Sequence, residues 1–315
     1  MQLISFRSDQ QECRVGVLLA DRVIDLAAAA WHYGIDGNLA RNMPDLIRAC
    51  VDGKLVLQQL ASAAPLAAIH ELSTVRLEAP IMPSTILCAG SNYRAHNSEK
   101  ANTPLSGKEP EFFVKTSDSV VGPDSAIRFD AALTQKLDCE TELAVVIGKP
   151  GRHIPIESAL DHVFGYTIVN DVTARDRQVR TASNGTVWYE LGRGKAFDTS
   201  APLGPVIVTA DEIADPQDLQ ISTRINGELR QHCSTSDMIW TCAELIHFFS
   251  INFTLRPGMV IITGSPAGTA WSADSELGGV WAGGEGLVRA TRYCLPGDEV
   301  ECQIDRIGTL RNTIQ

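Results

Sequence analysis

Three carboxylates beside apolar segments could bind a metal ion. The stretch LDCETELAVVIGK, residues 137–149, is rich in β-branched residues and predicts a strand from which Glu140 and Glu142 project on one face. Asp171 ends a second predicted strand, GYTIVND. Carboxylates in such positions repel one another and need a cation or a proton. Because no histidine or thiolate accompanies them, the oxygen donors favour Mg²⁺, Mn²⁺ or Ca²⁺ over zinc or copper.

The residues alone leave a second interpretation of these carboxylates open. Glu140 and Glu142 could lie on an exposed strand edge and form ion pairs with lysine or arginine. A calcium-binding protein is a further alternative, but the chain has no EF-hand or Gly/Asp repeat to supply the additional ligands.

The elements that must position these side chains are mostly short strands rich in valine and isoleucine, separated by glycine and proline. Helices are predicted only over 156–162, 173–182 and 237–250 in this part of the chain, the second with Thr173 and Asp176 as a capping box. The segments do not alternate regularly as strand and helix. The pattern therefore predicts an α+β fold, a mixed and strand-rich roll or distorted barrel, and not a doubly wound sheet.

The N-terminal segment has a different pattern. MQLISF and CRVGVLL predict paired strands, and residues 44–60 have helical periodicity. Pro80 and Pro83 bracket a predicted boundary. We expect a small α+β domain over 1–80 and a catalytic domain over 81–315.

Composition excludes several classes of partner. A net charge of −11 over 315 residues argues against nucleic acid and anionic membranes. The eight cysteines include no Cys-x-x-Cys pair and are expected to be free thiols in a reducing compartment. Neither a signal peptide nor an apolar run of about 18 residues is recognisable, so we expect a cytoplasmic protein without a membrane span.

A series of further stretches resembles the fumarylacetoacetate hydrolase family. The resemblance covers roughly residues 84–270 in order and resumes at the terminal hairpin. Its stretches are NYRAHNSE (92–99), EFFVKTSDSVVGP (111–123), DCETELAVVIGK (138–149), GYTIVNDVTARDRQ (165–178), GKAFDTSAPLGPVIVT (194–209), INGELRQ (225–231), MVIITGSPAG (259–268) and PGDEVECQIDRIGTLRN (296–312).

The resemblance implies a role for each matching residue. It implies that Glu140, Glu142 and Asp171 bind the metal, and that His96 and Glu99 form a catalytic pair on a lid. It also implies that Lys195 lies near the metal and the substrate oxygens. Read alone, a histidine near a glutamate such as His96 and Glu99 is more often a surface pair, and Lys115 and Lys195 fit solvated strand ends. The positions implied to contact substrate are Arg175, Gln178, Tyr189, Lys115, Thr199 and Thr263.

The resemblance further implies an enzyme, in which one Mg²⁺ or Mn²⁺ per subunit (with Ca²⁺ as an alternative) binds a small 2-oxo acid. The expected reaction is hydrolysis of a C–C bond in a 2,4-dioxo acid, such as an acylpyruvate, fumarylpyruvate, maleylpyruvate or 2,4-diketo-3-deoxy sugar acid, to pyruvate and a second acid. The same fold and metal site also fit an oxaloacetate decarboxylase, an enol tautomerase, a dehydratase or a ureidoglycolate lyase. A non-catalytic binding protein is the remaining alternative. A homodimer is the expected assembly.

The segment 270–293 is longer than the usual family link. Its Trp271, Trp281 and paired glycines suit either dimer packing or a wall of the substrate pocket, and the sequence favours neither.

Overall fold

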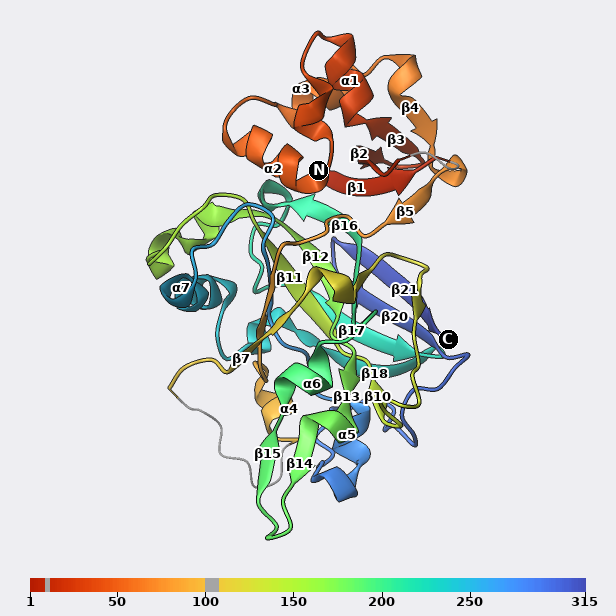
Figure 1. The fold of residues 1–315 in the computed structure, drawn as a ribbon, viewed down its shortest axis with the longest axis vertical. Helices are drawn as coiled ribbons and strands as arrows, with labels where there is room; N and C mark the ends of the chain where they lie inside the picture. The colour runs from red at the N-terminus through yellow and green to blue at the C-terminus, as the bar shows by residue number, and fades with distance from the viewer. Residues whose placement is uncertain (9–11, 100–107) are drawn as a thin grey trace.

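The computed structural model describes residues 1–8, 12–99 and 108–315. Its main feature is a twelve-stranded mixed sheet (Figure 1). The path of this sheet ends at β4 and at β7, so it stays open. The strand-rich α+β fold is thus confirmed, with an open sheet in place of a closed barrel. In path order the strands are β4 (Ile69–Glu71), β3 (Arg22–Asp25), β2 (Arg14–Leu19), β1 (Gln2–Arg7), β16 (Ala201–Thr209), β12 (Val163–Asn170), β11 (Thr141–Ile147), β19 (Val260–Ile262), β6 (Ile86–Ala89) and β7 (Phe112–Lys115), with β5 (Arg76–Glu78) on β1 and β8 (Val120–Val121) on β16.

The N-terminal strands belong to the same sheet. The predicted pair forms, because β1 and β2 are antiparallel neighbours. On its other side β1 pairs with β16 through Gln2↔Val208 and Leu3↔Ile207. Figure 1 shows this module at one end of the molecule, where three helices cover it. They are α1 (Leu26–His32), α2 (Met43–Val51) and α3 (Leu57–Ser62). The boundary at residue 80 remains a prediction.

A second, five-stranded sheet and two short ribbons complete the strands. The terminal hairpin forms as predicted, from β20 and β21. The order in the second sheet is β18 (Glu228–Ser234), β17 (Gln220–Ile225), β20 (Glu299–Ile304), β21 (Gly308–Ile314) and β9 (Ala126–Ile127). The ribbons are β10 (Leu137–Asp138) with β13 (Thr173–Ala174), and β14 (Val179–Thr181) with β15 (Val187–Tyr189).

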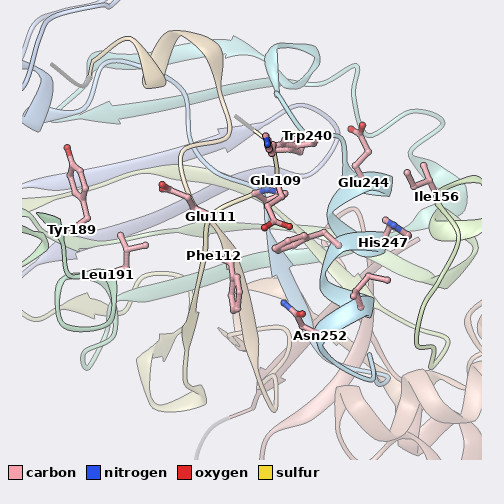
Figure 2. A pocket seen from close by; sticks show the side chains of 14 residues that line it. Glu109, Glu111, Phe112, Ile156, Tyr189, Leu191, Trp240, Glu244, His247 and Asn252 are labelled. Carbon is pink, nitrogen blue, oxygen red and sulfur yellow. The ribbon is translucent and has the colours of Figure 1, made fainter. Parts of the chain in front are cut away.

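Two of the three helices expected in this part of the chain are shorter in the structure. Helix α7 (Cys242–Asn252) begins at a capping box of Thr241 and Glu244, and the predicted helix 156–162 is a 3₁₀ helix. Phe112 of β7 packs edge-on against Phe248 and Phe249 of α7. Figure 2 shows the groove that these elements border. Of the described residues, no helix is long and apolar enough to cross a membrane.

The predicted helix 173–182 is wrong. Only α5 (Arg175–Gln178) is helical, between strands β13 and β14. Thr173 does not cap it, because its hydroxyl donates to Glu140 Oε2 at 3.0 Å and to the carbonyl oxygen of Asp171 at 2.9 Å. Pairing with other segments outweighs the local helical pattern here. The remaining short helices are α4 (Arg94–Asn97) and α6 (Leu191–Lys195).

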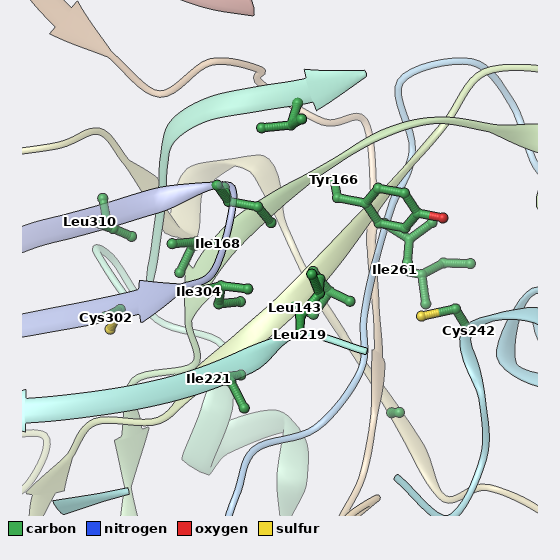
Figure 3. Close-up of a cluster of buried hydrophobic side chains, with 14 of the residues drawn as sticks. Leu143, Tyr166, Ile168, Leu219, Ile221, Cys242, Ile261, Cys302, Ile304 and Leu310 are labelled. Atoms are coloured by element: carbon green, nitrogen blue, oxygen red, sulfur yellow. The ribbon is translucent and has the colours of Figure 1, made fainter. Parts of the chain in front are cut away.

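Strand β11 is buried on both faces, which explains its continuous apolar run. Leu143 and Val145 belong to the core between the two sheets. Figure 3 shows part of this core, including Leu143, Ile168 and Ile221. Ala144 and Val146 face the opposite core, which the N-terminal helices share. Residues 143–146 therefore alternate between the two cores. The same alternation directs the carboxylates at the start of the strand to one side.

Candidate metal centre and active site

The carboxylate triad lies where β11 begins and β12 ends. Thr141 pairs with Asn170 in the antiparallel register, so Glu140 and Asp171 are neighbours, and the Asp171 amide donates to the Glu140 carbonyl at 2.8 Å. One carboxylate oxygen each from Glu140, Glu142 and Asp171 lies within 4.8 Å of the others. All three residues are at most 2% exposed. The exposed-edge interpretation is therefore wrong, and the expected convergence of the three side chains is confirmed.

Cations surround two members of the triad. Glu140 accepts from Arg175 Nη2 at 2.7 Å and from the Lys195 ammonium, which also donates to Asp171 Oδ2 at 2.5 Å. Burial favours the neutral form of Glu140, but the charges of Arg175 and Lys195 outweigh it and hold the pKa well below its usual value. Burial alone would lower the pKa of Lys195, yet Asp171 and Glu140 raise it overall.

Glu142 differs from the other two. Its Oε2 accepts from the Gly264 amide at 2.7 Å, but no cationic side chain among the described residues forms an ion pair with it. Burial, followed by the charge of Asp171, raises its pKa well above the usual value. The charged form of Glu142 in this position therefore needs a cation beside it.

The Oδ1 oxygen of Asp171 is a second donor that fits a bound cation. Its Oδ1 lies 2.9 Å from Lys115 Nζ, but it has no hydrogen bond of acceptable geometry. We treat this contact as an ion pair that leaves the oxygen free to coordinate. Together with Glu142, it forms an oxygen donor set that fits a hard divalent ion such as Mg²⁺ or Mn²⁺. Glu140, Glu142 and Asp171 are the residues that would hold it.

Arg175 connects the triad to the rest of the site. Its guanidinium donates to Asp138 Oδ2 and to Gln178 Oε1, each at 2.9 Å, besides Glu140. The Trp271 ring lies over it, 5.6 Å away. The residue is 1% exposed, so every contact is formed in a dry environment. Arg175 therefore fixes the orientation of the Glu140 carboxylate and of the Gln178 amide.

The predicted pair of His96 and Glu99 forms beside the triad. His96 Nδ1 lies 2.6 Å from Glu99 Oε2, and its Nε2 lies 3.7 Å from Glu140 Oε1. The two residues are 5% and 0% exposed. The interpretation as a surface pair is therefore wrong. With Nδ1–H donated to Glu99, Nε2 retains a lone pair that can accept a proton.

A small pocket of about 40 Å³ is lined by the triad carboxylates, His96, Arg175 and Lys195, together with Tyr189, Gln178 and Trp271. The pocket continues, through Glu111, Tyr189 and Leu191, into an open groove of about 1130 Å³. Figure 2 shows Tyr189 and Leu191 at one end of this groove and His247 at the other. The groove is the larger hollow, but the triad carboxylates and His96 line the small pocket, which we take as the site.

Three predicted residues do not line the pocket in this structure. Lys115 is fully buried behind Asp171, where its ammonium contacts the carbonyl oxygens of Val172, Lys195 and Ser200. The Thr263 hydroxyl donates to a strand carbonyl at 3.0 Å. The Thr199 hydroxyl accepts from the Arg128 amide at 2.9 Å. Contact of these three with substrate stays a prediction.

Sequence reasoning missed several residues that support the site. Asp138 accepts from Arg175 and from the amides of Ala270 and Trp271. Ser265 Oγ donates to Glu140 Oε1 at 3.3 Å. The glycines of TGSPAG carried a usable signal, because Gly268 has a φ of +108° and a Cβ there would lie 1.8 Å from a backbone oxygen.

Comparison with known proteins shows the family of the chain. Residues 85–315 match the family described as fumarylacetoacetate (FAA) hydrolase C-terminal. The chain is 42% identical over 248 residues to oxaloacetate tautomerase YisK of Bacillus subtilis (strain 168), covering 78% of this chain and 75% of that protein. It is 39% identical over 319 residues to the mitochondrial oxaloacetate tautomerase fahd2 of Xenopus laevis, covering 100% and 90%.

A solved structure extends the similarity over the whole chain. It is the maleylpyruvate hydrolase of Sphingobium sp. SYK-6 in complex with manganese(II) and pyruvate. The TM-score is 0.73 at 28% identity, and the match covers 100% of this chain and 98% of that chain. From its sequence and its fold, the protein belongs to the fumarylacetoacetate hydrolase family.

Proposed function

We propose that this protein is a divalent-metal-dependent tautomerase that interconverts the enol and keto forms of oxaloacetate. The observation that carries the proposal is the buried His96–Glu99 pair, a proton acceptor located beside a carboxylate triad. Two similar proteins from distant organisms are named oxaloacetate tautomerases, which favours this reaction over the hydrolysis expected from the sequence.

The residues of the pocket suit a small 2-oxo acid. A metal ion held by Glu140, Glu142 and Asp171 would supply a positive charge for the 2-oxo and carboxylate oxygens. Lys195, beside Glu140 and Asp171, would stabilise negative charge on the C2 oxygen. Arg175 holds the Gln178 carbonyl, so the Gln178 amide nitrogen is left to donate to a substrate oxygen.

Tautomerisation moves one proton off the substrate and returns one. In the enol-to-keto direction, the C2 hydroxyl loses its proton and C3 gains one. In the reverse direction, a base must remove the C3 proton. His96, oriented through Nδ1 by Glu99, is the base that we assign to C3, because its Nε2 carries the lone pair towards the pocket.

Hydrolysis of a 2,4-dioxo acid is the second candidate. The same His96–Glu99 pair could activate water, and a structurally similar protein is a maleylpyruvate hydrolase. Decarboxylation of oxaloacetate would need the same stabilisation of the C2 oxygen by Lys195. Fold and metal site do not separate these reactions, so the substrate test must.

The test measures the loss of enol-oxaloacetate absorbance with Mn²⁺ or Mg²⁺, at an enzyme concentration well below that of substrate. We expect catalysis above the spontaneous rate, and loss of it in His96→Ala with metal affinity retained. His247→Ala, which alters a half-buried histidine of the neighbouring groove, is the matched control and should stay active. Cleavage of maleylpyruvate or an acylpyruvate without tautomerisation of oxaloacetate would replace this proposal with the hydrolase.

A homodimer and a cytoplasmic location also remain proposals. Light scattering coupled to size-exclusion chromatography tests the first, since one chain has a mass of 34.1 kDa. Imaging of a tagged chain in its own cells tests the second.

A further inference from the structure

The segment 268–280, which includes the start of the long link, contacts the predicted lid at Glu99. Gly268 donates its amide to Glu99 Oε1 at 2.7 Å, and the Thr269 hydroxyl donates to Glu99 Oε2 at 3.2 Å. The Val280 amide donates to the Glu99 carbonyl oxygen at 2.9 Å. The segment therefore binds both carboxylate oxygens and the backbone of one residue.

The Thr269 hydroxyl has a defined direction. Its oxygen accepts from the Ser272 amide at 3.3 Å, where Thr269 begins the short 3₁₀ helix Ala270–Ala273. A hydroxyl has a single proton, so the proton is left for Glu99. Thr269 is 1% exposed and Glu99 is fully buried, which excludes water as a competing partner.

The same segment is anchored to the metal side of the pocket. The amides of Ala270 and Trp271 each donate to the Asp138 carboxylate at 3.1 Å. Asp138 in turn binds Arg175, which binds Glu140. One segment thus contacts both the His96–Glu99 pair and the group that orients a triad carboxylate.

We propose that residues 268–280 form a latch that keeps Glu99 aligned with His96, and that Thr269 is the positioning residue of this latch. Glu99 Oε2 accepts from both His96 Nδ1 and Thr269, so a change in the Thr269 contact alters the orientation of the imidazole. The role rests on the proposed function of the pair. The proposal assigns residues 270–280 of the link to the site and not to dimer packing.

The test compares three variants with the wild type by kinetics in saturating Mn²⁺. Thr269→Val removes the hydroxyl at constant shape, and Thr269→Ser retains it. A hydrogen bond to a charged group contributes enough for a loss in kcat of about tenfold, with KM and metal affinity unchanged. The serine variant should recover most of kcat. Thr167→Val is the control, because Thr167 is also fully buried and its hydroxyl donates to the Gly204 carbonyl oxygen on the neighbouring strand.

A double-mutant cycle separates positioning from general stability. In a Glu99→Ala background, Thr269→Val should cause no further loss of kcat, because the latch acts only through Glu99. An equal loss in both backgrounds would overturn the proposal. So would a serine variant as slow as the valine variant.

Amide hydrogen exchange tests the latch without any substrate. Thr269→Val should speed exchange in the peptide covering residues 93–99, and Thr167→Val should not. Unchanged exchange in Thr269→Val would refute the latch. If the wild-type protein turned over no oxo acid, the proposed function would fail, and the exchange result would still decide on the latch.

Discussion

Glu142→Gln should change the stability of this protein in opposite directions with and without a metal ion. Glu142 is 2% exposed, next to two other carboxylates, and has no ion-pair partner among the described residues. In metal-free protein, the neutral amide replaces a buried carboxyl whose charged form is unfavourable, while the Gly264 amide keeps an acceptor. We therefore expect the metal-free variant to be at least as stable as the wild type.

Metal binding reverses this order. A ligand at 100 times its dissociation constant stabilises the folded state by about 2.7 kcal/mol. With an unfolding entropy of roughly 2.1 cal/mol/K per residue, that corresponds to about 4 °C in Tm for a chain of this length. The variant lacks one charged ligand, so the same Mn²⁺ concentration should raise its Tm by much less.

Differential scanning calorimetry with EDTA and with graded Mn²⁺ measures both effects. Glu299→Gln, which alters an exposed strand glutamate of the second sheet, is the matched control and should respond to Mn²⁺ as the wild type does. An equal Mn²⁺-dependent rise in Tm for Glu142→Gln and the wild type would refute the assignment of the metal to the triad. A metal-free Glu142→Gln variant much less stable than the wild type would refute the claim that the charged form of Glu142 is unfavourable without a metal ion.

Three further changes test separate features. Lys115→Met should lower the free energy of unfolding of metal-free protein by about 3 kcal/mol, because it removes the buried ion pair between Lys115 and Asp171. Urea titration measures this free energy, and a loss below about 1 kcal/mol would contradict a stabilising role of the ion pair. The Arg292 hydrogen bonds hold the pKa of Asp298 well below its usual value, so Asp298 should stabilise the fold above about pH 4 and lose this contribution as the pH falls further. The difference in free energy of unfolding between the wild type and Asp298→Asn should therefore narrow from about pH 6 to about pH 3. A constant difference would contradict the ion pair of Asp298 with Arg292. Thr241→Ala, which removes the cap of α7, should cost about 1 kcal/mol of stability at unchanged kcat, and a loss of kcat would show that the helix start affects the site.

A local pattern and the family resemblance together predicted the main side chains of the site. The period of two along a strand places Glu140 and Glu142 on one face, and the structure confirms it. The resemblance implied the pair of His96 and Glu99, whose spacing of three suits a helical turn, and the structure confirms that the two side chains meet. Both predictions concern neighbours in sequence, for which backbone geometry alone sets the distance.

Local pattern failed where a segment pairs with distant parts of the chain. The helical pattern of residues 173–182 gave way to two short strands, because β13 pairs with β10 and β14 pairs with β15. The resemblance implied that Lys115 contacts substrate, which stays a prediction, and only the fold shows that the residue is buried behind Asp171. No local rule states which side of a strand end faces a pocket and which faces the core.

The sequence by itself determined the identity of the carboxylates, the face from which two of them project, the pairing of His96 with Glu99 and the strand-rich fold. Only the tertiary structure decided which cations balance the triad and what holds Glu99. Those contacts join residues far apart in the chain, such as Ala270 with Asp138 and Gly268 with Glu99, at separations of 132 and 169 residues. Such distances are set by the packing of the whole sheet, which no short stretch of sequence encodes.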